Sequence, residues 1–250
     1  MLFTVITINL NNAEGLEKTI ESVLAQERSL YEYIVIDGAS TDGSVELAKS
    51  YGDKIDCFIS EPDKGIYNAM NKGIALAKGE YVIFMNSGDC FASADVLHRV
   101  AGLKLTADIA IGAMRQKKRW GYWVEKPAKV SGYNLLYRTY CHQSTFTKTS
   151  VLRELGGYNE NLKIAADACF LFEAFIRHNK VPMTFDFCVS DYAPGGISDT
   201  NFDLGHTERE TYFKDNFTNI YKDYVKVHKW LRFSPSNVLR VIKLRLCSLM

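Results

Sequence analysis

The 250-residue sequence has no long hydrophobic run, and this excludes a membrane-spanning helix. Such a helix needs about 18 or more consecutive apolar residues, and no segment of the chain approaches that length. The first residues also lack a basic region and a small-residue cleavage site, so we expect a first strand there and not a signal peptide. These absences predict a cytoplasmic protein.

The six cysteines form no C-x-x-C pair, and none lies in a histidine-rich cluster with the spacing of zinc ligands. This excludes the common zinc-binding modules. In the cytosol such cysteines stay reduced. We therefore expect free thiols and no disulfide framework.

The formal net charge is only +1, which excludes a global electrostatic attraction to nucleic acid. One basic and aromatic segment, residues 115–123, is expected to form a hairpin or loop. It is too short to predict a nucleic-acid site by itself.

The chain also has no internal repeats, no low-complexity tract and no flexible linker. With no linker between the halves, we expect one compact unit with two functional lobes.

The charge is unevenly distributed along the chain. Residues 220–250 contain seven basic residues and one acidic residue, a net charge of +6, so residues 1–219 carry −5. Apolar residues alternate with these cations at helical spacing, as in helices that lie on a membrane surface. The tail therefore predicts peripheral binding to anionic lipid on the cytoplasmic face of the inner membrane. The alternative is that it packs against the body or against a second subunit in a homodimer.

Two short apolar runs in the first ninety residues each lead into a carboxylate. Residues 33–36 end at Asp37, and residues 81–85 lead to Asp89. Buried strands of parallel sheets have this character, and ligands bind beyond their carboxyl ends. The repetition predicts a ligand site, whereas the alternative is that Asp37 and Asp42 only build a turn and cap the next helix.

The alternation of elements predicts an α/β fold with a mainly parallel sheet flanked by helices. We expect strands at residues 4–8, 33–37, 55–60, 81–85 and 109–112, with helices between them. Asn11 or Asn12 is expected to cap the first helix, and Gly79 to end the third. Later in the chain we expect an irregular segment at 126–140, a strand at 143–147 and a helix opening at Ile164. We expect one bent strand or two short strands at residues 181–193 and a mobile loop at residues 195–198. The remainder of the chain is expected to be helical.

Several motifs occur together in an order and spacing that resemble glycosyltransferase family 2. They are TVITINLN (4–11), IDGASTDG (36–43), GIYNAMNKG (65–73), GEY (79–81), FMNSGD (84–89), HQ (142–143), AD (166–167) and GGIS (195–198). The resemblance covers residues 4–200 and is strongest to bacterial enzymes that assemble exopolysaccharide or O-antigen. It implies a GT-A fold over residues 1–200, with a nucleotide-sugar-binding half (1–113) and an acceptor half (114–200). Residues 201–250 would then form a helical, basic tail.

The resemblance also implies which residues bind the nucleotide-sugar donor. Asn9 and Asp37 correspond to polar contacts to the base and ribose, and Asn68 lies in the donor-binding motif at 65–73. Lys64 would reach a phosphate or the base, although a solvated lysine is equally compatible with this position. His142 would contact the diphosphate or the acceptor, and its alternative is a core histidine.

The metal-binding D-x-D-type motif of the family corresponds to residues 86–89. Asn86 and Gly88 stand where acidic residues are often found, so Asp89 is the only carboxylate of the motif. A divalent cation, Mg²⁺ or Mn²⁺, would offset the charge that develops on the departing diphosphate. The resemblance thus implies Asp89 as the metal ligand and Asn86 as a donor contact, and the alternative role of Asp89 is a turn or helix cap.

Asp167 is the expected catalytic base. In an inverting transfer the acceptor hydroxyl attacks C1 from the face opposite the diphosphate, and a base must accept its proton. That base belongs on the acceptor side, far from the metal motif in sequence. Asp167 has apolar neighbours that would desolvate it, and a helix-capping role would be compatible with this function.

The resemblance implies inverting transfer of a hexosyl or N-acetylhexosaminyl group from a UDP-linked donor to a saccharide or lipid-linked saccharide. The alternatives are a non-catalytic sugar-nucleotide-binding protein and a sugar-phosphate nucleotidyltransferase. The latter would be expected to carry a glycine-rich basic loop after its first strand, and residues 9–12 are not one. A glycoside hydrolase would need two carboxylates flanking one bond, but not the nucleotide-end motifs.

Overall fold

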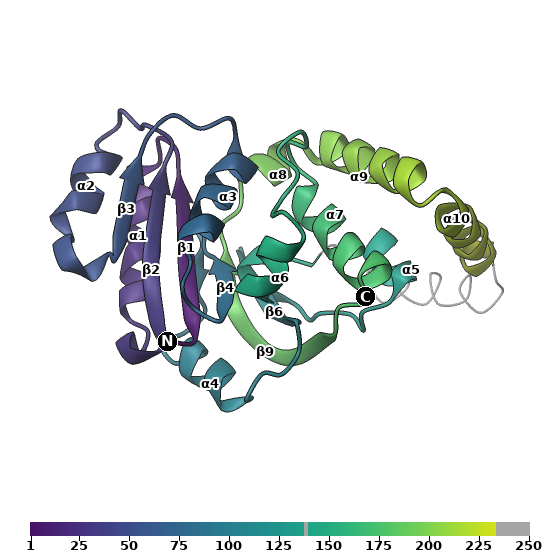
Figure 1. Ribbon diagram of the computed structural model, residues 1–250, viewed down its shortest axis with the longest axis horizontal. Helices are drawn as coiled ribbons and strands as arrows, with labels where there is room; N and C mark the ends of the chain where they lie inside the picture. Colours follow the sequence, from purple (N-terminus) through teal and green to yellow (C-terminus); the bar gives the residue numbers. More distant parts are fainter. Residues whose placement is uncertain (138–139, 234–250) are drawn as a thin grey trace.

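A computed structural model describes residues 1–137 and 140–233, and in this part of the chain one curled sheet extends through both halves (Figure 1). The strand order is β3-β2-β1-β4-β8-β6-β9-β5, and β7 pairs with β6. The strands are β1 (Phe3–Asn9), β2 (Tyr31–Asp37), β3 (Cys57–Ser60), β4 (Tyr81–Phe84), β5 (Cys90–Phe91), β6 (Ile109–Lys118), β7 (Gly121–Glu125), β8 (Thr145–Lys148) and β9 (Pro182–Tyr192). The α-helices are α1 (Ala13–Leu24), α2 (Ser44–Ser50), α3 (Ile66–Leu76), α4 (Val96–Gly102), α5 (Gly132–Tyr137), α6 (Thr149–Glu154), α7 (Ala166–Phe172), α8 (Ile197–Thr200), α9 (Phe202–Asn216) and α10 (Thr218–Phe233).

The N-terminal half contains the parallel part of the sheet. β1 pairs in parallel with β2 and β4, and β2 pairs in parallel with β3. Every residue of β1 and β2 is buried, because helices cover both faces. Alternate residues of β1 belong to different hydrophobic cores. Val5 is in the core with α1 and α4 on one face of the sheet, and Ile6 is in the core with α3, α6 and α7 on the other face. The predicted α/β fold is confirmed.

The C-terminal half extends the same sheet with mixed pairing. β8 lies antiparallel between β4 and β6, and β6 and β7 form the hairpin predicted at residues 115–123. β9 is one strand with register shifts against β6 on either side of Ala113, so the bent-strand alternative is correct. β6 extends to Lys118, beyond its predicted end at residue 112, because β7 and β9 both pair with its second half.

Several local predictions are wrong where tertiary contacts decide the conformation. Gly79 does not cap α3, which ends at Leu76 with Ala77 as its cap. A Cβ atom on Gly79 would lie 2.5 Å from the carbonyl carbon of Phe3, so glycine permits the close approach of this segment to β1. The segment 126–140, predicted to be irregular, contains α5, and α8 begins within the predicted 195–198 loop. Asn12 does cap α1, accepting a hydrogen bond from the Gly15 amide at 3.1 Å.

The C-terminal helices are fixed to the body at their aromatic side chains. The ring of Phe172 on α7 lies 4.3 Å from that of Phe213 and 4.6 Å from that of Phe217. From this contact α10 extends away from the β1–β3 end of the molecule (Figure 1). The chain is helical up to Phe233, as predicted, and the predicted role of residues 234–250 lies outside the described residues.

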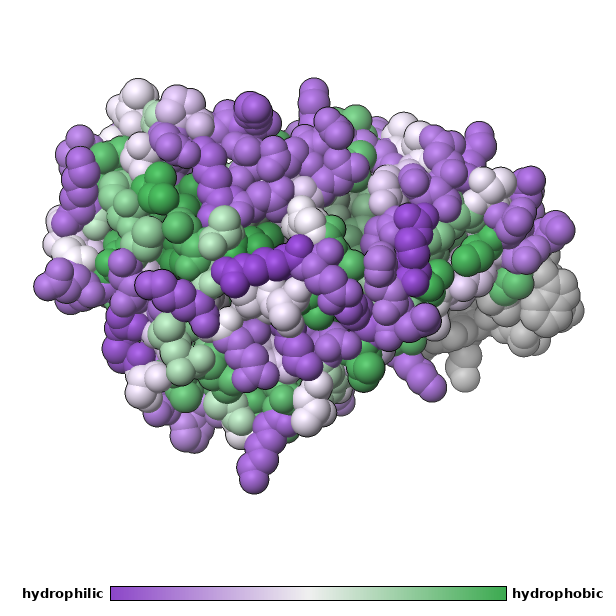
Figure 2. Space-filling model, in the orientation of Figure 1, coloured by the Kyte–Doolittle hydropathy of each residue, from purple (hydrophilic) through white to green (hydrophobic). Residues whose placement is uncertain are grey.

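The surface is dominated by polar side chains. On the face drawn in Figure 2, hydrophilic residues separate smaller hydrophobic patches. Within residues 1–137 and 140–233, no helix has the length and apolar character needed to cross a bilayer.

Candidate functional site

The carboxyl ends of β1, β2 and β3 bring three polar residues into register. Asn9 pairs with Asp37, and Asp37 pairs with Ser60. The Asp37 carboxylate has no exposed surface, and each of its oxygens accepts two hydrogen bonds. The donors are the Asn9 side chain at 2.8 Å, the Ser40 hydroxyl and amide at 2.6 and 2.9 Å, and the Ser60 hydroxyl at 2.7 Å.

These hydrogen bonds determine the ionisation of Asp37. Burial by itself raises the pKa of the carboxyl, but the bonds from Ser40, Asn9 and Ser60 outweigh it and hold the pKa below its ordinary value. Asp37 is therefore an ionised group that orders the ends of three strands. A nucleotide would reach its oxygens only by displacing one of these donors.

The turn at residues 86–89 completes the strand-end cluster. The Ser87 hydroxyl donates to Asn9 Oδ1 at 2.6 Å, which joins this turn to β1. The Asp89 side chain is buried; Oδ2 accepts from Gln143 Nε2 and Oδ1 from the Ala193 amide, both at 2.9 Å. Asp89 thereby connects the turn to the segment that follows β9.

An open cleft of about 1320 Å³ lies over these strand ends. Its walls include Asn9, Asn86, Asp89 and His142 among the residues predicted to bind the donor, together with residues 192–198. Asp37, Lys64 and Asn68 do not line the cleft.

Lys64 and Asn68 lie beside the cleft. Lys64 is exposed in the loop between Asp63 and Gly65, two residues that do line it. The Asn68 side chain donates to Glu160 Oε2 at 2.9 Å and accepts from the Lys64 amide at 3.1 Å, which fixes the start of α3. The donor roles of both residues stay predictions.

His142 connects the turn at residues 86–89 to Asp167. Its Nδ1 atom lies 3.2 Å from Asp167 Oδ2, and its Nε2 atom lies 2.9 Å from Asn86 Nδ2. An ionised carboxylate accepts the Nδ1 hydrogen, so in the neutral ring Nε2 is the acceptor and Asn86 the donor. The amide oxygen of Asn86 is then left as a buried atom without a hydrogen-bond partner.

Asp167 lies in the first turn of α7, with its carboxylate held from several sides. Oδ1 accepts from the Ala168 amide at 2.8 Å and lies 3.3 Å from the Tyr67 hydroxyl. That hydroxyl also donates to the carbonyl of Ile164 at 2.6 Å. Burial and, to a smaller degree, the negative charge of Asp167 raise the pKa of Tyr67 well above its ordinary value, so it stays a donor.

A second pocket opens on the other side of Asp167. Its walls include Asp167, Ser198, Phe202 and Arg209, and Ser198 also lines the first cleft. Phe202 is 71% exposed although it is a large hydrophobic residue. The two cavities therefore meet at Ser198 and are linked through the contact between His142 and Asp167.

Glu208 fixes the wall of this second pocket. Its carboxylate accepts hydrogen bonds from the backbone amides of Lys163, Ile164 and Ala165 at 2.8, 2.9 and 3.1 Å. The helix begins at Ala166 and not at the predicted Ile164, and Glu208 supplies an acceptor for the backbone amides just before it. They also hold α9 beside the residues that position Asp167.

The carboxylates available for a divalent cation are few. In the described residues no group of three or more His, Cys, Asp or Glu side chains is arranged to bind a metal. Asp89 and Asn86 are on the same turn and both residues line the cleft, and the amide oxygen of Asn86 is a buried atom without a hydrogen-bond partner. Both are oxygen ligands of the kind that Mg²⁺ and Mn²⁺ prefer, so the turn fits a cation whose remaining ligands are phosphates and water.

Sequence reasoning missed four contributors to the site. Tyr67 and Ser198 lie within the motifs at 65–73 and 195–198, but neither was given a role of its own. Phe202 and Glu208 lie in a helical segment whose hydrophobic pattern carries no sign of a site. Their roles depend on α9 packing against the start of α7, which joins residues about forty positions apart in the chain.

Comparison with known proteins identifies the family. The sequence model of Glycosyl transferase family 2 matches residues 4–172. The chain belongs to this family. An uncharacterized glycosyltransferase of Mycobacterium tuberculosis is 31% identical over 200 residues, covering 75% of this chain and 74% of that protein.

Solved structures agree with this assignment at the level of the fold. Staphylococcus aureus TarS (residues 1–349, in complex with UDP-GlcNAc) matches with a TM-score of 0.70 and 17% identity, over 95% of this chain and 74% of that one. The mannosyltransferase PcManGT of Pyrobaculum calidifontis, in complex with GDP-Man and Mn²⁺, has a TM-score of 0.66 and 18% identity, over 93% and 70%. This family 2 protein therefore has the GT-A fold and is a glycosyltransferase, an enzyme that transfers a sugar.

Proposed function

We propose that this glycosyltransferase carries out inverting transfer of a hexosyl or N-acetylhexosaminyl group from a UDP-linked donor. The acceptor is a saccharide or lipid-linked saccharide in cell-surface polysaccharide assembly. One observation carries the proposal: a cleft over the strand ends and a second pocket meet across Asp167 and His142. Two substrates on opposite sides of a carboxylate are what an inverting displacement with a general base needs.

The donor occupies the larger cleft in this proposal. Asn9 contacts the base, with Asp37 ordering the strand ends behind it, and Lys64 approaches the phosphates from the loop beside the cleft. Asn68 holds that loop and His142 faces the diphosphate. The sugar nucleotides in the titles of the TarS and PcManGT structures support a nucleoside-diphosphate donor, and UDP is proposed from the sequence resemblance.

A divalent cation, Mg²⁺ or Mn²⁺, fits the 86–89 turn and would be held by Asp89 and Asn86. When bound, it offsets the negative charge of the leaving diphosphate. The Mn²⁺ named with PcManGT supports this proposal. The hydrogen bonds from Gln143 and Ala193 hold the Asp89 carboxylate in place at this turn.

Asp167 is the proposed general base. The acceptor oxygen forms a bond to C1 as the bond from C1 to the diphosphate oxygen breaks, and the acceptor proton moves to the Asp167 carboxylate. His142 fixes Oδ2, while Ala168 and Tyr67 fix Oδ1, so the carboxylate does not need to reorient for the reaction. Preorganisation of this kind lowers the entropic part of the barrier.

The acceptor occupies the second pocket in this proposal. The exposed ring of Phe202 offers an apolar face to a sugar ring, and Arg209 supplies hydrogen-bond donors beside it. Glu208 keeps α9, and with it this wall, in position. A Phe202→Ala variant should therefore raise KM for the acceptor and leave the affinity for the donor unchanged.

Peripheral membrane association and a cytoplasmic location remain part of the proposal, as does a homodimer as the alternative role of the tail. Lipid-linked acceptors would explain a basic tail, since Lys and Arg attract anionic headgroups. The residues of the tail beyond Phe233 lie outside the described residues. Truncation before Ser234 would separate the two roles, because loss of vesicle binding supports the first and dissociation of a dimer supports the second.

The experiment that tests sugar transfer starts with the donor. A thermal-shift screen of UDP, GDP and other nucleoside diphosphates, with and without Mn²⁺, identifies the base and the cation, because a ligand that binds the native state raises its stability. The matching sugar nucleotides are then incubated with a free saccharide and with a polyprenyl-diphosphate saccharide. We expect nucleoside diphosphate release that depends on the acceptor, and NMR of the product should show an inverted anomeric configuration.

Other outcomes of this assay separate the alternative functions. Nucleotide binding without acceptor-dependent release would indicate a non-catalytic sugar-nucleotide-binding protein. Release of pyrophosphate from a nucleoside triphosphate and a sugar phosphate would indicate a nucleotidyltransferase. A product with retained configuration would contradict the proposed role of Asp167 and leave sugar transfer intact.

A further inference from the structure

The β6–β7 hairpin exposes large hydrophobic side chains at its tip and along β7. Trp120 is 88% exposed at its tip, and Tyr122, Trp123 and Val124 on β7 are 54%, 49% and 44% exposed. Successive residues of a strand point to opposite faces, so both faces of the hairpin carry exposed hydrophobic residues. Surface patches of this kind mark interaction sites.

Cations accompany the aromatic residues on both faces. Lys117 pairs across the hairpin with Tyr122, and Lys118 pairs with Gly121, which lies two residues from Trp123 and therefore on the same face. The Arg119 guanidinium lies 4.9 Å from the centre of the Trp120 ring. In the described part of the chain, Lys117, Lys118 and Arg119 take part in no ion pair, and residues 115–124 include no acidic residue.

We propose that the β6–β7 hairpin is a docking site for a lipid bilayer with anionic headgroups. Trp and Tyr rings favour the interface between lipid and water, where the ring is apolar and its polar group stays hydrated. Lys and Arg extend their charges to the headgroups while their stems lie along the apolar region. The hairpin presents both kinds of side chain together, which fits a membrane surface better than a purely polar or a purely apolar partner.

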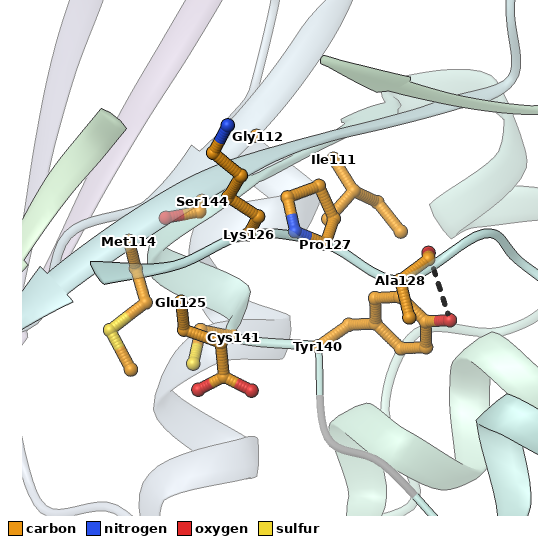
Figure 3. A pocket seen from close by; sticks show the side chains of 10 residues that line it. All are labelled: Ile111, Gly112, Met114, Glu125, Lys126, Pro127, Ala128, Tyr140, Cys141 and Ser144. Atoms are coloured by element: carbon orange, nitrogen blue, oxygen red, sulfur yellow. Dashed lines mark hydrogen bonds between the residues drawn. The ribbon is translucent and has the colours of Figure 1, made fainter. Parts of the chain in front are cut away.

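The hairpin is continuous with strands that lead to the candidate site, so a membrane bound to it would lie near that site. Gln116 of β6 pairs with Tyr192, which lines the donor cleft. Trp120 is four positions beyond Gln116 and past the end of β6 at Lys118, so their Cα atoms are at most about 14 Å apart. At the other end, Met114 and Glu125 line a small pocket together with Cys141, the residue before His142 (Figure 3). A membrane bound at the tip therefore lies beside the mouth of the site.

A second copy of the chain is the main competing partner, because β7 hydrogen-bonds only to β6 among the described strands and its other edge is open. Charge argues against it. Pairing two hairpins through their β7 edges would place two clusters of like charge, Lys117, Lys118 and Arg119 of each copy, near each other, and like charges repel. A lipid surface of opposite charge has no such cost. The inference does not depend on sugar transfer or on residues 234–250.

The three tryptophans of the sequence make the test direct, since Trp120 and Trp123 are in the hairpin and the third is Trp230. In a full-length Trp230→Phe variant, the fluorescence reports on the hairpin alone. Phosphatidylcholine vesicles that contain about 30% phosphatidylglycerol present an anionic surface. Adding them should shift the tryptophan emission to shorter wavelength. Brominated lipids in the same vesicles should quench it. Wild-type protein should co-sediment with these vesicles and not with pure phosphatidylcholine.

Two variants and one control distinguish the hairpin from the other basic surfaces of the chain. Replacing Lys117, Lys118 and Arg119 by Gln should weaken vesicle binding by about 100-fold, at the usual contribution of each cation near an anionic surface. Replacing Trp120 and Trp123 by Ser in the otherwise wild-type chain should weaken co-sedimentation by about 10-fold. The matched control replaces three exposed lysines elsewhere, Lys49, Lys54 and Lys104, by Gln and should bind like the wild type.

Several results would overturn the inference. One is that the protein binds neutral vesicles as well as anionic ones. Others are an emission spectrum that lipid does not change, or hairpin variants that bind vesicles like the control variant. Loss of binding only on truncation before Ser234 would assign the contact to the tail. A change of mass in light scattering for the tryptophan variant, without a change in vesicle binding, would assign the surface to a second copy. Transfer to a soluble acceptor in each variant reports separately on the proposed function.

Discussion

The imidazole of His142 bridges Asn86 and Asp167, with its two nitrogens 2.9 and 3.2 Å from their side chains. The bridge joins the turn under the donor cleft to the first turn of α7. Because the ring is held at both nitrogens, His142 couples the position of Asn86 to that of Asp167. The two halves of the site are thus one hydrogen-bonded unit.

Asp167→Asn should lower the rate of transfer by about 10²-fold or more, the usual scale for loss of a general base. The amide keeps the size of the side chain but accepts no proton at neutral pH. The affinity for the nucleotide, measured by calorimetry, should stay nearly unchanged because Asp167 does not line the donor cleft. Asp203→Asn, on the exposed start of α9, is the control. Equal losses of donor affinity and turnover would make Asp167 structural.

His142→Ala should both weaken donor binding and lower kcat, because the ring lines the cleft and orients Asp167. The double variant with Asp167→Asn should lose less activity than the sum of the single losses. Neighbours in one hydrogen-bond network show coupling energies of about 0.5–3 kcal/mol. Additive losses in this cycle would mean that His142 acts on the donor alone.

Asp89→Asn should weaken the effect of Mn²⁺ on nucleotide binding, because the turn loses its only anionic ligand. Titrations of nucleoside diphosphate with and without Mn²⁺ measure this effect, and Asp53→Asn on an exposed turn is the control. The melting temperature in the absence of ligand checks that the contacts to Gln143 and Ala193 survive. An unchanged Mn²⁺ dependence would show that the cation is held elsewhere.

Asp37→Asn should destabilise the fold by about 1–3 kcal/mol at neutral pH, the cost of leaving buried donors unsatisfied. The effect should depend on pH in a defined direction. The pKa of Asp37 in the folded protein lies below its ordinary value of 3.8, so the carboxylate contributes fully above pH 3.8. Its contribution is lost as the pH falls through the lower folded pKa.

Denaturant unfolding of Asp37→Asn and wild type at several pH values tests this prediction. The difference in unfolding free energy should be constant at neutral pH and should shrink below pH 3.8. A difference that grows on acidification would mean that the protonated carboxyl is the stabilising form.

The sequence by itself determined the parallel half of the sheet and the edge at which the site lies. Apolar runs of strand length identify buried strands because only a strand covered on both faces is hydrophobic throughout, as β1 and β2 are. Polar residues at the ends of such runs meet at one edge, which is why Asp37 and Asp89 were found from their positions, whereas Asn9 followed from the family resemblance. The linked motifs then identified the family.

Tertiary structure alone decided which of these residues line the cleft and what surrounds Asp167. Asp37 is at the expected edge, yet its own neighbours occupy its oxygens, and sequence spacing carries no record of how many donors converge on a carboxylate. Glu208 stabilises the start of α7 from about forty residues away, and Phe202 forms the pocket wall only because α9 packs there. Local patterns fix strands and helices because backbone preferences act over a few residues, whereas contacts between distant segments depend on how those elements pack.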